Sequence, residues 1–404
     1  MEKYQILIVG GGAAGIATAS SLYKRDPLLK MAIIEPSKTH YYQPGWTMVG
    51  AGVFQKEETS RPVDNVMPSY VSHIKGSVWS FQPDASTVTL EDGTVLCYEY
   101  LVVAAGLKLD WSAIEGLESS LGKNGVTSNY RYDMAPYTWE LVQKMRGKEA
   151  IFTQPPMPIK CAGAPQKAMY LSCSSWKRSG KIKEINVSFC NAGPVLFGCA
   201  DYVPPLMEYV KSYGIKLDFG YNLVKVDGPN QIATFKVTEE GKEPQLIERK
   251  FDMLHVCPPQ CAPDFIAASP LANEGGWMDV DQGSLQSTKV PNIFGLGDVT
   301  STPNAKTAAA ARKQAPIVAE NIIAKMKNTA MPKIYDGYGS CPLTVEHGKI
   351  ILAEFGYGGK VMPSFPWDST KPRRTAWILK KLILPWVYWN AMMKGREWLV
   401  SAKS

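Results

Sequence analysis

The glycine-rich segment YQILIVGGGAAGIATASSLYKRD, near the start of the chain, constrains the fold more than any other stretch. The apolar run at residues 5–9 predicts a buried strand, and the alanine-rich run from about Ala13 predicts a helix. Between them, Gly10, Gly12 and Gly15 match the spacing G-x-G-x-x-G. The first glycine permits a tight turn, the second lets the backbone approach a pyrophosphate, and the third lets helix and strand pack closely. The segment therefore predicts a Rossmann-like unit.

An acidic residue follows at the distance that a nucleotide site requires. MAIIEPS ends a second predicted strand at Glu35, whose carboxylate can accept hydrogen bonds from both hydroxyls of a ribose. Free N–H groups at the start of the predicted helix face the phosphates. Strand, turn, helix and acid together predict a dinucleotide site formed by Gly10, Gly12, Ala13, Ala14, Gly15 and Glu35.

Two later segments favour FAD over NAD as the dinucleotide. YEYLVVAAGLK (residues 98–108) is a predicted buried strand that leads into Gly106, and VPNIFGLGDVTS (290–301) is one that leads into Asp298. Two-dinucleotide flavoproteins return to FAD at such strand ends, with an aspartate at the ribityl chain. The helix predicted after residue 304 would stabilise negative charge on a reduced flavin through its dipole. The alternative for Asp298 is a plain helix cap.

The segment EINVSFCNAGPVLFGCADYVPPLMEYVKSYGIKL (184–217) repeats the strand–turn–helix plan without its glycines. Asn191 and Leu196 occupy the positions of the first and third glycine, and Pro194 removes an N–H group that a phosphate would use. We therefore expect a second Rossmann-like domain that has no functional NAD(P)H site.

Composition excludes several other classes of protein. Hydrophobic residues make up 45% and charged residues 20% of the 404 residues, as in ordinary folded proteins. The four histidines and eight cysteines show no zinc-site spacing, so we expect no metal. The net charge of +7 is carried entirely by residues 371–404, whereas nucleic-acid binding would spread basic residues over a domain face. No nucleic-acid partner is expected.

The basic C-terminal segment also holds RRTAWILKKLILPWVYWNAMMKGREWL, in which apolar residues recur at helical spacing. We expect a break at Pro385 and, on either side, interfacial amphipathic helices on a membrane surface. The alternative is a helix that docks on its own domain or on a partner subunit, which leaves a homo-oligomer open. No run of about 18 apolar residues predicts a spanning helix.

Two cysteines stand in stiff local sequences. Cys161 lies in PPMPIKCAGAPQKAMYL, between a proline-rich run and a predicted helix, and Cys341 lies in YDGYGSCPLTVEHGK, between a Gly-Ser turn and a proline. Most isolated cysteines are small apolar core residues. A thiol near a helix N-terminus can instead be reactive, because that environment lowers its pKa.

These motifs together resemble the sulfide:quinone oxidoreductases, specifically the group that includes the mitochondrial enzyme. The resemblance covers nearly the whole chain, including CAGAPQK, MLHVCPP, KTAAA, SCPL and ILAEF. It implies a flavoprotein that oxidises hydrogen sulfide through a Cys161–Cys341 disulfide and passes two electrons to quinone. Cys341 would carry the sulfane sulfur as a persulfide, and Cys161 would be the thiolate that faces the flavin. The sulfur would pass to sulfite, glutathione, coenzyme A or sulfide. A merely structural disulfide is the alternative.

The resemblance also assigns supporting residues. It places the cation of Lys306 beside the flavin pyrimidine ring and adds Thr307, Gln43 and Val78 as cofactor contacts. The segment EPSKTHYYQPGWTMVGAG has no cysteine that could form a thioether, so we expect FAD to be non-covalent. The remaining cysteines are expected to be spectators, namely Cys97, Cys173, Cys190, Cys199, Cys257 and Cys261.

The predicted organisation is an α/β protein with two Rossmann-like, disulfide-reductase-type domains and a C-terminal amphipathic membrane-associating region. Residues 1–115 and 291–325 form the FAD domain, 116–290 the second domain, and 326–404 the region with Cys341 and the membrane and quinone helices. From the apolar run at residues 6–9, which begins almost at once, we expect no signal or transit peptide in this sequence. We expect a peripheral, monotopic protein of a bacterial cell membrane, or of the mitochondrial inner membrane if a transit peptide was removed.

Three other functions stay open at this point. A type II NADH:quinone oxidoreductase would share the fold and the tail, but it needs the nucleotide loop that residues 191–196 lack. A flavoprotein subunit of a cytochrome-linked sulfide dehydrogenase would need a flavin-linking cysteine. A non-enzymatic flavoprotein scaffold for a membrane partner would bind FAD that sulfide does not reduce.

Overall fold

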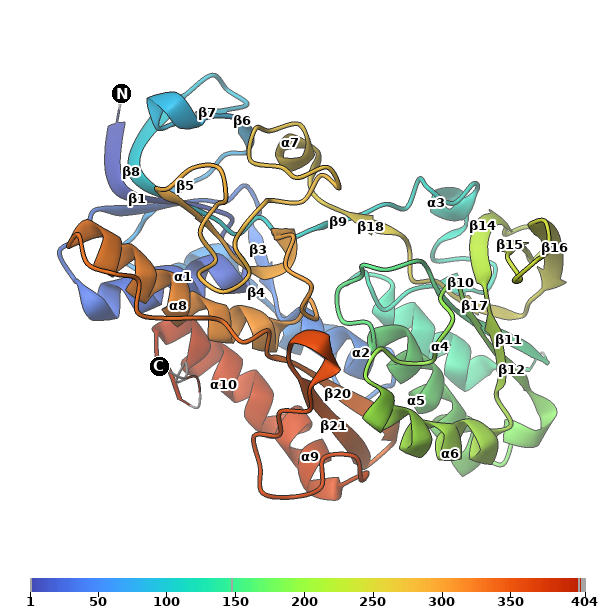
Figure 1. Ribbon diagram of the computed structural model, residues 1–404. Helices are drawn as coiled ribbons and strands as arrows, with labels where there is room; N and C mark the ends of the chain where they lie inside the picture. The colour runs from blue at the N-terminus through green and yellow to red at the C-terminus, as the bar shows by residue number, and fades with distance from the viewer. Residues whose placement is uncertain (1, 147, 399, 401–404) are drawn as a thin grey trace.

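The computed structural model describes residues 2–146, 148–398 and 400, and these form two lobes with the C-terminal region packed against both (Figure 1). The first lobe is built on a parallel sheet. In spatial order its strands are β5 (Ser72–Ile74), β2 (Met31–Ile34), β1 (Glu2–Val9), β8 (Val95–Val103) and β19 (Ile293–Gly295). The antiparallel strands β6 (Val78–Gln82) and β7 (Thr87–Leu90) extend the sheet from the first half of β8.

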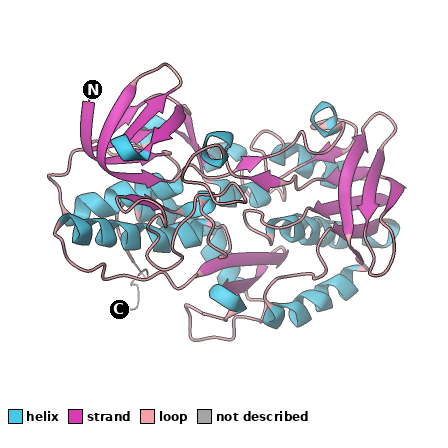
Figure 2. Ribbon diagram, turned by 45° about the horizontal axis from the view of Figure 1, so that its top comes forward, coloured by secondary structure: helices cyan, strands magenta, loops and turns pink. Residues whose placement is uncertain are grey.

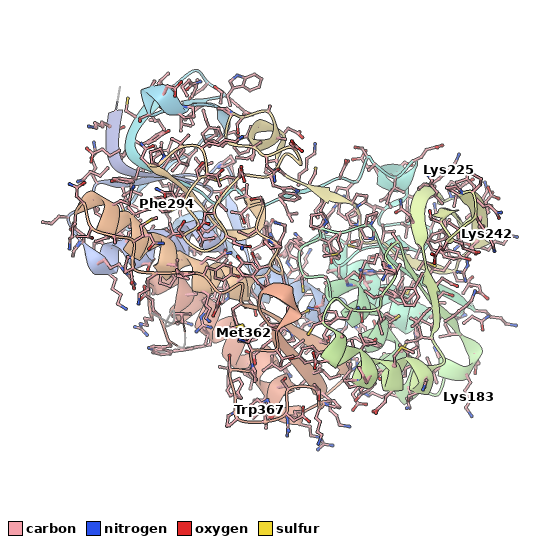
Figure 3. All side chains as sticks on the ribbon, in the orientation of Figure 1. Lys183, Lys225, Lys242, Phe294, Met362 and Trp367 are labelled. Atoms are coloured by element: carbon pink, nitrogen blue, oxygen red, sulfur yellow. The ribbon has the colours of Figure 1, made fainter. Side chains whose placement is uncertain are left out.

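Helices α1 (Ala13–Arg25) and α8 (Ala308–Met326) pack against each other and bury apolar side chains with the sheet of the first lobe. The close approach of α1 to β1 depends on Gly15, because a Cβ atom there would overlap the carbonyl oxygen of Gly10. Phe294 of β19 lies inside this lobe and is fully buried (Figure 3).

The second lobe has its own parallel sheet. In spatial order its strands are β10 (Val126–Thr127), β17 (Met253–His255), β11 (Glu149–Gln154), β12 (Asn186–Asn191) and β13 (Lys216–Phe219). Its longer helices are α4 (Ala135–Lys144), α5 (Ala164–Arg178) and α6 (Val203–Tyr213). At the outer edge of the molecule lies an antiparallel sheet of β14 (Tyr221–Asp227), β15 (Ile232–Val237) and β16 (Gln245–Lys250) (Figures 1 and 3).

Short elements complete the two lobes and join them. The lobes are bridged by the antiparallel pair β9 (Lys108–Leu109) and β18 (Gln260–Cys261). The others are β3 (Thr39–Tyr41), β4 (Ser60–Pro62), α2 (Trp46–Val49), α3 (Leu117–Ser120) and α7 (Asp264–Ala267). Two parallel sheets with helices confirm the predicted α/β class, whereas the domain boundaries as such stay a prediction.

The C-terminal region lies along the lower side of the molecule in Figure 1, with α10 beneath the first lobe, and begins with a hairpin of β20 (Gly339–Glu346) and β21 (Lys349–Phe355) near the junction of the lobes (Figures 1 and 2). A helical run follows, from α9 (Arg374–Ile378) through a π-helical turn (Leu379–Ile383) into α10 (Leu384–Asn390). The predicted break at Pro385 is wrong, because helical dihedrals continue on both sides of it. In the π turn directly upstream, the Leu384 N–H donates to the Leu379 carbonyl oxygen.

One face of this helical run is part of the core of the first lobe. Tyr388, Trp389, Met392 and Met393 are at most 5% exposed there and pack with residues such as Ile16. Burial of a large apolar side chain stabilises by about 1.5–3 kcal/mol, so these four residues hold the tail firmly. The other face is exposed. In the described part of the chain no helix has the length and apolar character needed to cross a membrane.

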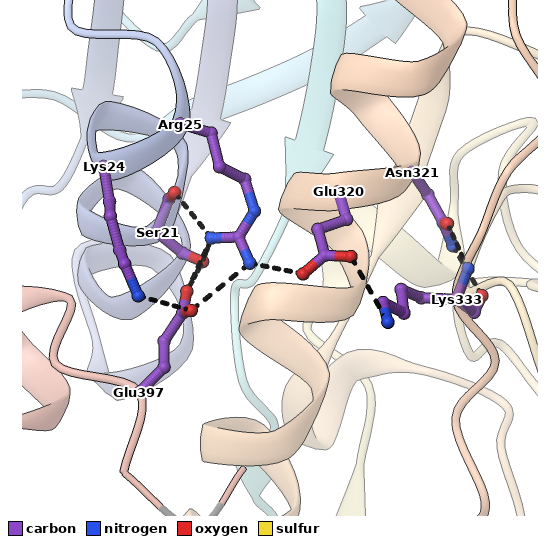
Figure 4. Close-up of polar contacts among 7 residues, drawn as sticks. All are labelled: Ser21, Lys24, Arg25, Glu320, Asn321, Lys333 and Glu397. Atoms are coloured by element: carbon purple, nitrogen blue, oxygen red, sulfur yellow. Dashed lines mark hydrogen bonds and ion pairs between the residues drawn. The ribbon is translucent and has the colours of Figure 1, made fainter. Parts of the chain in front are cut away.

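A cluster of charges fixes the end of the tail to the first lobe (Figure 4). Glu397 accepts hydrogen bonds from Ser21, Lys24 and Arg25 of α1. The Arg25 guanidinium also contacts Glu320 of α8 at 2.6 Å. Because Arg25 and Glu397 are both largely buried, their ion pair is screened less than a surface pair. The tail therefore docks on its own domain, as the alternative reading of the sequence allowed.

Candidate active site

The glycine loop occupies the carboxyl edge of the first sheet and leaves space for a ligand. Gly10 has φ of +103°, and a Cβ atom there would lie 2.5 Å from the Ala104 carbonyl oxygen. A Cβ atom at Gly12 would meet nothing within 4 Å. The Gly11 N–H donates to Glu35 Oε2 at 2.8 Å, so the acid that ends β2 is joined to the loop.

Other predicted cofactor residues meet at the same edge, because parallel strands end there together. Gly106 follows β8 with φ of +70° and has open space at its Cβ position. Asp298 follows β19, and burial raises the pKa of its carboxyl group. Lys306 donates to the carbonyl oxygens of Asp298 and Thr300 at 2.9 and 2.7 Å, and burial lowers its pKa to about 8.

Three predicted contacts have other surroundings. Thr307 caps α8, with its Oγ1 accepting the Ala310 N–H at 3.1 Å. Gln43 accepts a hydrogen bond from Lys160 Nζ at 2.6 Å, which places it beside the cysteine loop. Val78 is buried in the apolar core of the first lobe.

The residues at this edge fit a bound dinucleotide. Ala13 and Ala14 open α1, so its first N–H groups lie next to the space at Gly12. Near the start of α8, Asn304 Oδ1 and Gln314 Nε2 are buried and have no hydrogen-bond partner within the described chain. Buried polar atoms are normally satisfied, so these two atoms fit contact with a polar ligand.

The corresponding loop of the second lobe is closed upon itself. Asn191 Oδ1 accepts the Gly193 N–H, and its Nδ2 donates to the Val195 carbonyl oxygen, both at 2.8 Å. Leu196 is buried in the core of that lobe, and α6 begins only at Val203. The Asn191 side chain thus hydrogen-bonds to the backbone of the turn, where a phosphate would bind in a nucleotide site.

Cys161 lies on the loop between β11 and α5, in a rigid frame. Its φ is +49°, a left-handed conformation that costs energy for a residue other than glycine. Its N–H donates to the Lys306 carbonyl oxygen at 2.8 Å, which joins the carboxyl edge of the second lobe to that of the first. Its own carbonyl oxygen accepts from the Tyr130 hydroxyl at 3.3 Å and from the Ala164 N–H at 2.6 Å.

Cys341 lies on β20 and contacts Cys161. Its sulfur lies 3.7 Å from that of Cys161, although the two residues are 180 positions apart. A Cβ atom at Gly163 would overlap the Cys341 sulfur, so the glycine of CAGAPQK makes room for the pair. Cys341 is 2% exposed, whereas Cys161 is partly accessible.

A lysine that the sequence analysis missed completes the thiol site. Lys167 of α5 is 3% exposed, and its Nζ lies 2.9 Å from the Cys161 sulfur. A hydrogen bond from the Cys341 thiol and the charge of Lys167 hold the pKa of Cys161 well below its usual value. The pKa of Cys341 is raised, because it donates that hydrogen bond and is buried. Of the two thiols, Cys161 is therefore the more acidic.

The tail supplies a second buried lysine. Lys380, in the π-helical turn, is 3% exposed and donates to the Pro44 carbonyl oxygen at 3.2 Å. Burial and the nearby charge of Lys167 lower its pKa to about 7. Tyr388 of the tail also reaches the nucleotide edge, since its hydroxyl lies 2.7 Å from His40 Nε2, and His40 Nδ1 lies 3.2 Å from the Gly11 carbonyl oxygen.

The remaining cysteines are not part of the 3.7 Å contact between Cys161 and Cys341. Burial raises the pKa of Cys173, Cys190, Cys199 and Cys257, which suits core residues. Cys257 packs with Tyr130 in the apolar cluster that also contacts Cys161.

Comparison with known proteins assigns the family. The family profile described as pyridine nucleotide-disulphide oxidoreductase matches residues 4–150. The mitochondrial sulfide:quinone oxidoreductase of Mus musculus is 39% identical over 394 residues, which cover 98% of this chain and 87% of the relative. The Dictyostelium discoideum protein of the same name is 40% identical over 395 residues, covering 97% of this chain and 86% of the relative.

Solved structures share the fold. The sulfide:quinone oxidoreductase from Aquifex aeolicus superposes with a TM-score of 0.80 at 21% identity, covering 98% of this chain and 92% of that one. NDH2 from Plasmodium falciparum, solved in complex with RYL-552, gives a TM-score of 0.68 at 10% identity, covering 99% of this chain and 100% of that one. At these identities the likeness shows the fold alone. The full-length relatives show more: the chain belongs to the sulfide:quinone oxidoreductase family.

Proposed function

We propose that this protein oxidises hydrogen sulfide and passes two electrons to quinone. The observation that carries the proposal is the thiol pair at the meeting point of the two carboxyl edges. Cys161 and Cys341 lie 3.7 Å apart, and the Cys161 backbone is bonded to Lys306 of the nucleotide edge. A purely structural cysteine pair would need neither the strained backbone at Cys161 nor a buried cation at its sulfur.

The thiol environment supports a definite first step. In the oxidised protein the hydrosulfide anion attacks the Cys341 sulfur, the Cys161–Cys341 bond breaks, and Cys161 leaves as a thiolate. Cys341 then carries a persulfide. The Lys167 ammonium at 2.9 Å stabilises the leaving thiolate, and a good leaving thiol is one with a low pKa.

The second half returns the pair to its starting state. A small nucleophile takes the outer sulfur of the persulfide, and the candidates are sulfite, glutathione, coenzyme A and a second sulfide. Cys341 is left as a thiol, which loses its proton as the two sulfurs re-form their bond and release two electrons. FAD, when bound, supplies the two-electron acceptor for that closure and the donor to quinone.

The family's flavin cofactor is proposed to be FAD, bound without a covalent link. Its pyrophosphate would be held by Gly10, Gly12, Ala13, Ala14 and Gly15, its ribose by Glu35, and its remaining parts by Gln43, Val78, Gly106, Asp298, Lys306 and Thr307. The open spaces at Gly12 and Gly106 support this placement. The Lys306 amine has its hydrogen bonds to Asp298 and Thr300, so it positions this loop as well as supplying charge.

Electron input from NADH is less well supported than input from sulfide. The Plasmodium NDH2 shares the fold, so the fold does not separate the two activities. The second loop distinguishes the two activities, because the Asn191 side chain hydrogen-bonds to the turn where NADH would bind and Leu196 is buried. A cytochrome-linked sulfide dehydrogenase is opposed by the cysteine-free segment that follows Glu35.

We also propose peripheral attachment to a membrane through the exposed face of the tail. Ile378, Leu382, Ile383 and Trp386 are 46–60% exposed on the helical run whose other face is docked. Large apolar side chains at such exposure suit insertion at the level of the lipid headgroups. The double variant Leu382→Ser/Ile383→Ser should be released from the membrane fraction and should keep sulfide-dependent flavin reduction. Retention of this variant on membranes would refute the attachment.

A turnover assay tests the activity. Purified protein should reduce a short soluble quinone analogue when sulfide is present and should not do so with NADH. Reduction that depends on NADH and ignores sulfide would replace the proposal with the rival activity.

A further inference from the structure

A basic pocket of about 410 Å³ lies outside the site described above, at the far end of the β20–β21 hairpin from Cys341. It is lined by Lys177 and Arg178 from the end of α5, by His347 and Lys349 at the hairpin turn, and by Arg374 at the start of α9. The five residue steps from Cys341 to Glu346 span about 17 Å of extended strand, so this pocket is separate from the thiol site.

The walls of the pocket are tied together by hydrogen bonds. The His347 N–H donates to Ser174 Oγ at 3.0 Å, and its Nε2 lies 3.3 Å from the Ala51 carbonyl oxygen. Ile350 and Arg373 exchange two main-chain hydrogen bonds of 3.1 and 2.9 Å, which fix the start of the tail to the hairpin. The basic groups are therefore presented by one rigid frame rather than by separate mobile loops.

The pocket carries an excess of positive charge. Lys349 pairs with Glu346 at 2.7 Å, and Lys177 donates to Ser212 at 2.9 Å. Arg178 and Arg374 have no carboxylate partner among the described residues. Burial and the charge of Arg178 lower the pKa of His347. The guanidinium groups of Arg178 and Arg374, both in the lining of the pocket, are therefore the charges available to bind an anion.

We infer that this pocket binds the phosphate of an anionic phospholipid headgroup. Arg374 begins the helical run whose exposed apolar residues include Ile378 and Leu382, and Leu382 lies about 12 Å further along the helix. A phosphate held at the start of the run and apolar side chains inserted beyond it match the layered chemistry of a membrane surface. The inference rests on the proposed membrane attachment, and it adds a specific headgroup site to an otherwise apolar contact.

The test is a binding titration with dihexanoyl phosphatidylglycerol, kept below its micelle concentration. The full-length flavoprotein should bind one molecule saturably, and dihexanoyl phosphatidylcholine should bind at least about tenfold more weakly. The variant Arg178→Gln/Arg374→Gln should weaken phosphatidylglycerol binding about 30-fold, because each basic residue near anionic lipid contributes roughly a fivefold factor. The matched variant Lys381→Gln/Lys394→Gln removes the same charge from exposed tail positions outside the pocket and should stay within twofold.

Equal losses in the two variants would overturn the pocket and leave only general surface charge. Inorganic phosphate at matched ionic strength that displaces the lipid completely would identify a free anion as the ligand and overturn the lipid assignment. Sulfide-dependent flavin reduction is measured on the same samples. Should wild-type protein fail that assay, the proposed activity fails; should it pass while phosphatidylglycerol does not bind, the pocket alone fails.

Discussion

The two strand–turn–helix loops of this protein share a plan and differ in what fills them. In the first lobe, Gly12 has empty space beside it, and the Gly11 N–H is held by Glu35 at 2.8 Å. In the second lobe, the Asn191 side chain closes the turn with two hydrogen bonds of 2.8 Å, and Leu196 is buried where a glycine would admit a ligand. One carboxyl edge is open to a nucleotide, and the other presents a cysteine.

This difference shows how a two-nucleotide architecture can serve a different electron donor. The second lobe keeps its parallel sheet and still places the loop after β11 against the first lobe. Cys161 on that loop, with Lys167 at its sulfur, lies where the second lobe meets the nucleotide edge of the first. The sheet is reused as a scaffold for thiol chemistry.

The largest expected effect comes from removing either thiol. Cys161→Ser and Cys341→Ser should each abolish flavin reduction by sulfide, because the disulfide that hydrosulfide attacks cannot form. Both should retain bound flavin, since the glycine loop is untouched. Absorbance at the flavin band after anaerobic sulfide addition measures both properties.

The matched control is Cys257→Ser, which removes a buried thiol from the same apolar cluster. It should keep sulfide-dependent reduction close to that of the wild type. Turnover near the wild-type rate in either Cys161→Ser or Cys341→Ser would take that residue out of the mechanism and weaken the contrast between the two edges.

Removing the cation at the thiol should have the next largest effect. In Lys167→Met the pKa of Cys161 should rise, because the ammonium at 2.9 Å is lost. At pH 7, alkylation of Cys161 by iodoacetamide in the reduced protein should slow about 10- to 100-fold, a factor of ten for each pKa unit. Its pH profile should move to higher pH, and Lys211→Met, at an exposed site on α6, should leave the profile in place.

Lys380 connects the tail to the thiols through a measurable pH dependence of stability. Its pKa is about 7 when folded, compared with about 10.4 in an unfolded chain. Between these values the unfolded chain binds one more proton, so the free energy of unfolding should rise with pH, by up to about 1.4 kcal/mol per unit. Urea unfolding at several pH values should show this slope in the wild type and a shallower one in Lys380→Met. Identical slopes would mean that burial and the charge of Lys167 do not lower the pKa of Lys380.

The smallest effect is expected at the closed loop. Asn191→Ala removes two hydrogen bonds of the turn and should cost about 1–2 kcal/mol of folding stability. Flavin content and sulfide reactivity should not change, and NADH should still reduce nothing. A loss of flavin in this variant would give the second loop a role in cofactor binding.

The first lobe could be predicted from sequence because its signals are local. Gly10, Gly12, Gly15 and Glu35 lie within 26 residues and are tied to the strand and helix that carry them. Spacing of this kind survives folding unchanged. The lack of glycines in the loop at Asn191 could be predicted to remove a nucleotide site for the same reason, since it is visible in the local sequence.

The thiol site could not be predicted from spacing. Cys161 and Cys341 are 180 positions apart, and only the resemblance to a family paired them. Lys167 was overlooked although it interrupts the apolar face of a predicted helix six residues after Cys161, a signal that could have marked a buried cation. Lys380 counted only as one charge of a basic tail, and nothing in its local sequence shows that it turns inward.

The helical pattern of the tail was predicted from the sequence, whereas its docking on the first lobe was only one of two alternatives. Helical spacing was evident, but spacing alone does not say which apolar face meets protein and which meets lipid. Tyr388 and Trp389 belong to the core of the first lobe, while Leu382 and Trp386 are exposed. Deleting residues 371–404 would therefore disturb the flavin lobe, so substitutions on the exposed face are the cleaner probe of membrane attachment.

The most direct test of the central claim is anaerobic titration of the oxidised flavoprotein with sulfide and, separately, with NADH. The account predicts that sulfide bleaches the flavin absorbance to completion at near-stoichiometric amounts, and that NADH leaves it unchanged over the same period. Bleaching by NADH, or an unchanged flavin in the presence of excess sulfide, would contradict the assignment of electron input to the Cys161–Cys341 pair.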